Sequence, residues 1–323
     1  MIQIQNLKKV FGPKVAVDGV SFAVEKGEVL GFLGPNGAGK STTMRMITGF
    51  IPPSEGSASI GGFDVTEKPI AAKRLFGYLP ENAPSYTDMT VRGFLNFAAE
   101  LCGLTGKAKQ TAVERVAETC FLRPVLEQSI ETLSKGYKHR VCFAQAIIHN
   151  PEVLIMDEPT EGLDPNQKHE MRSLIRRMGE TKAIIFSTHI LEEVEAACSR
   201  AIIIDRGKIV ANGTPRELKL RSQTAGTLTL TLGHAYGPFD GSASSVREKI
   251  DNLARVEKTM IIAESPLTIR VFPKGNPDSV TNELADALGQ LVLDQRWPIR
   301  ELRREEGRLD EVFRSITLSD REP

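Results

Sequence analysis

Residues 34–42 read Gly-Pro-Asn-Gly-Ala-Gly-Lys-Ser-Thr. This stretch follows a short apolar run at residues 28–33, typical of a buried strand, and leads into residues 42–47, which begin a helical pattern. Glycine lets the backbone turn where a side chain would clash, so the amide groups of such a loop can point inward at a phosphate. The positive end of the helix dipole adds to the attraction for an anion. The stretch therefore predicts a phosphate-binding loop between a buried strand and a helix.

The residue types within this loop predict separate tasks. Lys40 would reach the β- and γ-phosphates of a nucleotide, and the hydroxyl of Ser41 would bind Mg²⁺. The residues expected to surround the nucleotide are Gly34, Pro35, Asn36, Gly37, Ala38, Gly39, Lys40, Ser41 and Thr42. The loop thus predicts a nucleoside triphosphate and Mg²⁺ as ligands.

Two acidic residues and a histidine follow apolar strands further along the chain. Residues 153–156 are apolar and end in Asp157 and Glu158, and His189 follows a second strand pattern. A carboxylate at such a strand end can hold Mg²⁺, which is the predicted role of Asp157. Glu158 would accept a proton from the attacking water, or orient it. Because neighbouring parallel strands end at one edge of a sheet, His189 should lie close by and join Lys40 and Glu158 as a catalytic residue.

Composition narrows the class of protein. The 323 residues include 41 basic and 41 acidic side chains, so the formal net charge is zero, which argues against a dedicated nucleic-acid binder. No apolar run approaches the roughly 18 residues that span a bilayer, and residues 1–9 lack the apolar core of a signal peptide. We therefore expect a cytoplasmic protein without direct membrane insertion. The four cysteines form no metal-binding pattern and are expected to be reduced.

The order of patterns predicts an α/β fold. Residues 1–25 look like antiparallel strands separated by turns at Gly12-Pro13 and Asp18-Gly19. Strand and helix patterns then alternate, which implies a mainly parallel sheet. A helical subdomain at about residues 86–150 interrupts this alternation. These elements make up a nucleotide-binding domain predicted to span residues 1–221.

Residues 222–323 have a different character and predict a small α+β accessory domain. Residues 222–226 are small and polar, which suggests a linker. Beyond them the order of elements is βαββαβ, which suits a ferredoxin-like fold. The expected strands are residues 227–232, 255–263, 267–272 and 291–296, the expected helices are residues 245–253 and 277–288, and a short terminal helix lies at residues 309–313.

The motifs together resemble those of ATP-binding cassette (ABC) ATPases, the motor subunits of ABC transporters. Residues 133–137, Leu-Ser-Lys-Gly-Tyr, resemble the signature loop of that family, and residues 161–164, Glu-Gly-Leu-Asp, follow its acidic strand. The resemblance covers about residues 1–220. It implies that Phe11 stacks on adenine and that Ser134 and Gly136 bind the γ-phosphate held by an opposite subunit. It also implies that Asp164 links the two sites and that Glu81, at a position where the family usually has Gln, contacts Mg²⁺.

The resemblance further implies partners: a second ABC ATPase subunit, expected to be a second copy, and a separate integral membrane permease. Residues 78–81, the signature loop and residues 309–313 look like the exporter branch that works with ABC-2-type membrane subunits. Within it, residues 77–83 resemble ATPases of gliding-motility or copper-centre-assembly systems. The permease is expected to dock near Glu81 and residues 84–97.

Two alternatives to an exporter ATPase stay open from the sequence. Importer ATPases also carry C-terminal domains, so residues 222–323 do not decide the direction of transport. A non-transport mechanical ABC ATPase is the second, although such proteins insert long coiled coils between the two loops, and here the gap of about 90 residues shows no sustained heptads. Composition and pattern do not indicate the substrate.

Overall fold

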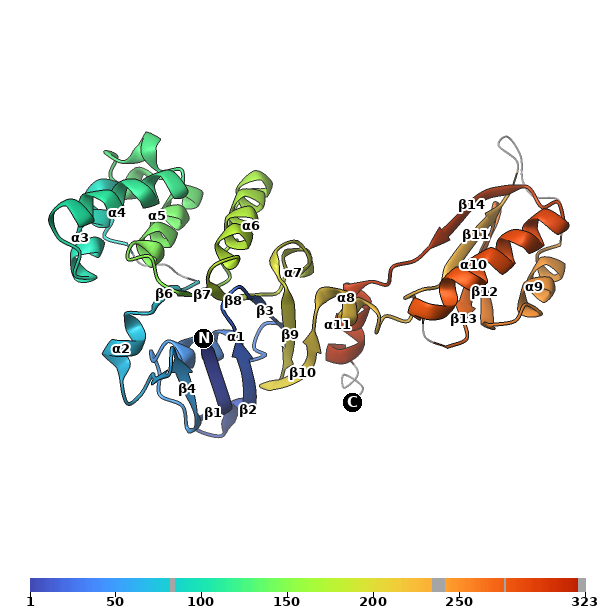
Figure 1. The fold of residues 1–323 in the computed structure, drawn as a ribbon, viewed down its shortest axis with the longest axis horizontal. Coiled ribbons are helices and arrows are strands. Elements are labelled where there is room, and N and C mark those ends of the chain that lie inside the picture. The colour runs from blue at the N-terminus through green and yellow to red at the C-terminus, as the bar shows by residue number, and fades with distance from the viewer. Residues whose placement is uncertain (82–84, 234–241, 276, 319–323) are drawn as a thin grey trace. The chain divides into compact units, whose positions relative to one another are not determined.

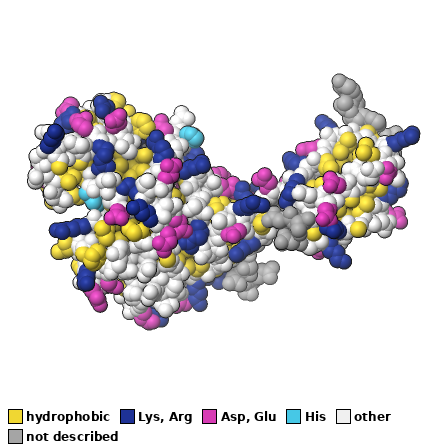
Figure 2. Space-filling model, viewed as in Figure 1, with side chains coloured by type: hydrophobic (Ala, Val, Ile, Leu, Met, Phe, Trp, Pro, Cys, Tyr) yellow, Lys and Arg dark blue, Asp and Glu magenta, His cyan; other side chains and the backbone are white. Residues whose placement is uncertain are grey.

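The structure, a computed structural model, describes residues 1–81, 85–233, 242–275 and 277–318. They form two compact units, Met1–Pro215 and Arg216–Pro323, which are described separately below (Figure 1). Pro84, at the start of the predicted docking segment, and residues 82–83 of the exporter-like segment lie outside the described residues. On the face seen in Figure 2, acidic and basic side chains are interspersed, which fits the balanced charge of the sequence.

The first unit is built on a six-stranded sheet in the order β10-β9-β3-β8-β7-β6. Strands β9, β3, β8, β7 and β6 are parallel, and β10 pairs with β9 in the antiparallel sense. Every residue of β3, β7 and β8 is buried, as expected for parallel strands covered on both faces. The strands are β3 (Val29–Leu33), β6 (Phe76–Leu79), β7 (Val153–Asp157), β8 (Ala183–Thr188), β9 (Arg200–Asp205) and β10 (Lys208–Gly213).

Alternate side chains of the buried strands enter two different cores. Leu154 and Met156 of β7 pack with the helical subdomain and with α6 (Pro165–Gly179), on the side of the sheet drawn uppermost in Figure 1. Val153 and Ile155 pack on the other side, with α1 (Lys40–Ile47) and the antiparallel strands. Because both faces of the sheet are buried, the register of its strands is fixed. The positions of the polar residues at the strand ends are therefore fixed as well.

An antiparallel sheet in the order β2-β1-β4-β5 covers the second core. The predicted turn at Asp18-Gly19 is wrong, because β2 continues through it. Leu7 lies opposite Val20 and Lys9 opposite Val17, so residues 18–19 form a bulge, which Gly19 permits with a φ of +72°. The elements here are β1 (Ile2–Phe11), β2 (Lys14–Val24), β4 (Glu55–Ile60) and β5 (Phe63–Asp64), with helix α2 (Pro69–Lys73).

The helical subdomain contains α3 (Val91–Leu101), α4 (Gly106–Thr119) and α5 (Lys135–Ile147). Side-chain oxygens cap two of these helices. The hydroxyl of Thr90 accepts a hydrogen bond from the backbone N–H of Gly93 at 3.0 Å, and that of Ser134 accepts one from Tyr137 at 3.4 Å. The fold class predicted for this unit is confirmed: a mainly parallel sheet, an antiparallel β subdomain and an inserted helical subdomain.

The second unit carries a four-stranded antiparallel sheet in the order β12-β13-β11-β14. With helices after the first and third strands, this is the ferredoxin-like arrangement that the sequence predicted. The elements are β11 (Leu228–Leu232), α9 (Ala243–Asp251), β12 (Val256–Glu264), β13 (Leu267–Pro273), α10 (Pro277–Asp294) and β14 (Ile299–Arg304), flanked by α8 (Pro215–Lys219) and α11 (Leu309–Leu318).

One prediction for this unit is wrong in detail. The strand expected at residues 291–296 is instead the end of α10 and the turn after it, and the last strand is β14. Leu284, Leu288 and Val292 recur every four residues on one buried face, which is helical spacing. Residues 222–226, the predicted linker, form a bend and turns, and Thr224 donates a hydrogen bond to Glu311 of α11 at 2.8 Å.

Within the described ranges, every helix falls short of the length and apolar character needed to cross a membrane.

Candidate nucleotide site

The loop predicted to bind phosphate connects β3 to α1, and its glycines are required by close packing. A Cβ atom on Gly34 would lie 2.5 Å from the carbonyl oxygen of Ile204, and one on Gly39 would lie 2.5 Å from that of Ala16. Gly39 also has a φ of +107°, in the region that favours glycine. The loop therefore packs tightly between β9 and β2.

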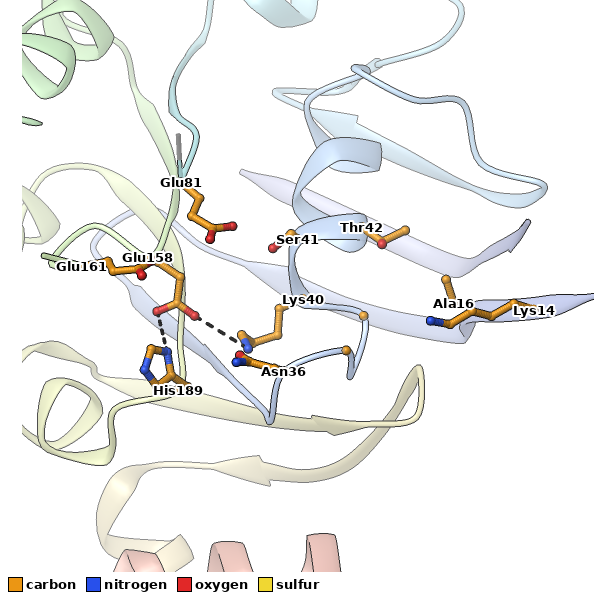
Figure 3. Close-up of a pocket in the computed structure, with 12 residues that line it drawn as sticks. Lys14, Ala16, Asn36, Lys40, Ser41, Thr42, Glu81, Glu158, Glu161 and His189 are labelled. Atoms are coloured by element: carbon orange, nitrogen blue, oxygen red, sulfur yellow. Dashed lines mark hydrogen bonds and ion pairs between the residues drawn. The ribbon is translucent and has the colours of Figure 1, made fainter. Parts of the chain in front are cut away.

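Lys40, at the start of α1, is the buried cation of the site. Its side chain is 6% exposed, and Nζ donates to the carbonyl oxygens of Gly34 at 2.8 Å and Pro35 at 3.3 Å. Nζ also lies 3.7 Å from Glu158 Oε1 (Figure 3). Burial lowers the pKa of Lys40, while the negative charges of Glu158 and Asp157 act in the opposite direction.

Ser41 and Asp157 form a cluster of oxygen atoms beside Lys40. The hydroxyl of Ser41 donates to Asp157 Oδ1 at 3.1 Å, and the hydroxyl of Ser187 donates to the same oxygen. Glu81 and Ser41 line one pocket. Hydroxyl and carboxylate oxygens are the hard ligands that Mg²⁺ prefers, so these residues fit that ion.

Glu158 occupies a constrained position between Lys40 and His189. It is 8% exposed, and its Oε2 lies 3.0 Å from His189 Nδ1. Its φ of +50° is unusual for a residue other than glycine. The backbone N–H of Glu158 bonds to both the carbonyl oxygen and the hydroxyl of Ser187, at 3.2 and 3.1 Å, which holds it there. Burial raises the pKa of Glu158, against the opposing effects of His189 and Lys40. A carboxylate with a raised pKa is a stronger base.

Lys40, Ser41, Glu81, Glu158 and His189 line one open pocket of about 380 Å³, and the predicted metal ligand Asp157 lies outside its described lining. Sequence reasoning missed three of the residues that line it, Lys14, Ala16 and Glu161. Lys14 and Ala16 lie at the start of β2, and no local sequence pattern indicates that this strand packs against the phosphate loop. Glu161 could have been predicted, because it stands three residues after Glu158. The lining residues are Lys14, Ala16, Asn36, Gly37, Gly39, Lys40, Ser41, Thr42, Glu81, Glu158, Glu161 and His189.

Seven predicted nucleotide contacts lie outside the described lining of this pocket. Three belong to the loop itself, Gly34, Pro35 and Ala38, and four lie on other elements, Phe11, Ser134, Gly136 and Asp164. Phe11 is 49% exposed at the end of β1. Ser134 caps α5, and Asp164 caps α6 by accepting a hydrogen bond from the N–H of Gln167 at 2.9 Å. Gly136 packs against the side-chain amide of Gln167, where a Cβ atom would overlap it. The two capped helix ends therefore form a second surface, and the pocket of this one copy does not include it.

The parallel sheet, the phosphate loop and the acidic strand end define a P-loop nucleoside triphosphatase. A family model described as ABC transporter matches residues 17–161. The linearmycin resistance ATP-binding protein LnrL of Bacillus subtilis strain 168 is 35% identical over 319 residues, which cover 98% of each chain. The Nod factor export ATP-binding protein I of Burkholderia pseudomallei strain 1710b is 38% identical over 218 residues, 67% of this chain and 72% of that protein.

Solved structures agree with these relatives. A structure entitled "Structure of ATP binding subunit of ABC transporter" is 30% identical, with a TM-score of 0.63 over 68% of this chain and 92% of that one. The dimeric ABC transporter cassette MJ0796 shares the fold, with a TM-score of 0.62 over 67% of this chain and 99% of that one at 20% identity. This chain belongs to the ABC transporter family, in which it is an ATP-binding subunit with ATPase activity.

Proposed function

We propose that this chain is the motor of an exporter: two copies close head to tail on two molecules of Mg-ATP, and hydrolysis lets them reopen. One observation carries this proposal. Lys40, Ser41 and Glu158 line one pocket, whereas Ser134, Gly136 and Asp164 sit at two other helix ends of the same copy. Since one copy presents both surfaces but does not bring them together, a second copy is needed to complete each site.

In the closed dimer, each copy would contribute what its partner lacks. The N-terminus of α5, with Ser134 and Gly136, is suited to an anion because its backbone N–H groups and helix dipole point outward. We assign it the γ-phosphate held by the partner's loop. Asp164 would link the two sites across the interface, and Phe11, exposed beside the pocket strand β2, would stack on adenine.

Within each pocket, Glu158 would accept the proton of the attacking water. His189 Nδ1 lies at hydrogen-bond distance from one carboxylate oxygen of Glu158. In the protonated ring both nitrogens are donors, so His189 would then also donate from Nε2 to the γ-phosphate or the water. Lys40 would neutralise phosphate charge. Ser41, Asp157 and Glu81 would hold Mg²⁺, which when bound offsets the charge of the phosphate oxygens. The attraction between these fixed charges and the phosphates supplies the catalysis.

The two compact units suggest two domains with different roles. We propose that residues 1–221 act as the nucleotide-binding domain, with the helical subdomain at about residues 86–150, and that residues 222–323 act as an accessory domain. The names of the relatives, a resistance protein and an export protein, favour export over import or a non-transport mechanical role. We propose that the export system is of the ABC-2 type. The chain would then work in the cytoplasm, bound to the inner face of the membrane through a permease.

A groove in the first unit offers a place for that permease. It lies between β6, α3 and α5, has a volume of about 180 Å³, and includes Tyr78, Ala98 and Leu101. Leu101 is 71% exposed, so its side chain is available for contact with a partner. Since Tyr78 lies three residues before Glu81, a permease helix seated here would be close in the chain to the metal end of the pocket.

Substituting Glu158→Gln tests the dimer and the base together. The amide keeps the shape but cannot accept a proton, so we expect turnover to fall about 100-fold or more. Mg-ATP should then accumulate in a stable dimer, visible by size-exclusion chromatography with light scattering. The proposal fails if this variant stays monomeric with Mg-ATP, or if it hydrolyses ATP at a near-native rate.

A further inference from the structure

A buried carboxylate lies just behind the nucleotide pocket. Glu193, on α7 (Leu191–Ala197), is 1% exposed. The hydroxyl of Thr160 donates to Oε1 of Glu193, and the hydroxyl of Thr188 donates to Oε2 at 2.7 Å. Glu193 does not line the pocket, and no role described above involves it.

The two threonines belong to the two loops that carry the proposed catalytic pair. Thr160 follows Glu158 by two residues, and Thr188 directly precedes His189. The paired register of strands β7 and β8 ends at Asp157 and Ser187. Beyond that point the two segments enter separate loops, and the carboxylate of Glu193 accepts one hydrogen bond from each loop.

Energetics make this link rigid. A buried carboxylate is stable only when its oxygens are hydrogen-bonded, and burying an unpaired one is strongly unfavourable. Here both oxygens have partners, and Thr188 is further fixed because its hydroxyl accepts a bond from the N–H of Ile190 at 3.0 Å. A fully satisfied buried network has one preferred arrangement, so the separation between the two loops is set.

We propose that Glu193 is a positioning residue for hydrolysis, which holds the loops of Glu158 and His189 at the separation that allows their 3.0 Å contact. Glu193 acts through Thr160 and Thr188 and touches neither nucleotide nor water. This inference rests on the proposed function, since it takes Glu158 as the base.

The test compares two neighbouring glutamates of one helix. Glu193→Gln keeps the shape but provides only one acceptor oxygen, so one threonine hydroxyl loses its partner. Glu192 is exposed, and Glu192→Gln is the matched control. We expect kcat of Glu193→Gln to fall about 10- to 100-fold, because small misplacements of reacting groups have effects of that size. The dissociation constant for Mg-ATP should stay within about twofold, since the phosphate loop is untouched.

A second readout separates positioning from a general loss of stability. Contact with His189 lowers the pKa of Glu158, so loosening that contact should move the acid limb of the kcat profile to higher pH in Glu193→Gln. If Glu193→Gln fails to fold, the variants Thr160→Val and Thr188→Val decide the question, because each removes one bond with little change in shape. Each should lower kcat and move the acid limb in the same direction.

The outcomes distinguish this inference from the proposed function. Suppose that Glu158→Gln is inactive, whereas Glu193→Gln or both threonine variants hydrolyse ATP at the wild-type rate. This result would overturn only the role of Glu193. Equal losses of kcat and Mg-ATP affinity with an unmoved acid limb would also overturn it, because they would indicate a purely structural residue. A near-native rate in Glu158→Gln would overturn the proposed function itself.

Discussion

Lys40 and Glu158 are buried charges of opposite sign, 3.7 Å apart. At such a distance the attraction is roughly 4 kcal/mol at an effective dielectric constant of 20, against about 1 kcal/mol in water. The pair therefore stabilises two ionised groups that burial alone would drive toward neutrality. A phosphate group near Lys40 would offer it another anion, and we expect this to release Glu158 from the ion pair to act on water.

The pH dependence of turnover follows from the burial of Glu158. Only the ionised carboxylate can accept a proton, and burial raises its pKa above the ordinary range of a glutamate. As the pH falls through this raised pKa, Glu158 becomes protonated and kcat should decline. We expect the decline to begin at a higher pH than an ordinary glutamate, with a pKa of about 4.3, would give. Steady-state kinetics at saturating Mg-ATP, with affinity measured at each pH, check this. A decline centred at or below that ordinary pKa would contradict it.

At the scale of single elements, α10 shows how burial rather than hydropathy defines a helix face. Leu288 is fully buried among the strands of the second unit, whereas Leu293, five residues further on, is 71% exposed. Leu284 and Val292 lie four residues to either side of Leu288 and share its buried face. The helix therefore depends on packing against the sheet for its stability.

A matched pair of leucines tests that packing. Leu288→Ala should destabilise the second unit by about 2–5 kcal/mol, because it removes buried methyl groups and leaves a cavity. Leu293→Ala should change the free energy of unfolding by less than about 0.5 kcal/mol, since that side chain already meets solvent. Urea unfolding of the two variants measures the difference. Equal effects would show that α10 does not pack as described.

The sequence predicts most elements of the fold because their patterns are strong. The strands that lead to Asp157 and His189 contain continuous apolar runs at residues 153–156 and 183–186. The errors have local causes. Residues 291–294 read Leu-Val-Leu-Asp, an apolar run too short to separate helix from strand. The true strand β14 is rich in exposed charge, including Arg300 and Arg303, so it lacks the apolar alternation of a half-buried strand.

The candidate site shows a similar division between local and long-range information. Lys40, Ser41 and Glu158 stand in motifs that specify their chemistry, so the sequence places them. Lys14 and Glu193 are different, because they reach the site through packing between segments distant in the chain. Such contacts depend on the register of strands and the position of helices, which a single sequence does not determine.

At the scale of the whole molecule, the proposed dimer divides each site between two copies. Lys40 of one copy and Ser134 of the other would meet on the same ATP. Lys40→Ala damages one half of each site, and Ser134→Ala damages the other half. A dimer made of either variant alone should therefore be inactive, since both of its sites are damaged. A mixed dimer differs, because one of its sites receives both defects and the other receives none.

Mixing the two inactive variants should therefore restore activity. With random exchange of subunits, half of the dimers are mixed and each has one intact site, so we expect up to about a quarter of the wild-type rate. The control places both substitutions in one chain: mixed dimers of this double variant with wild type have no intact site, so adding it should lower wild-type activity. An ATPase assay on both mixtures measures the effect. If the two single variants stay inactive together, while both bind to wild type, each copy must contain its own complete site and the head-to-tail arrangement is wrong.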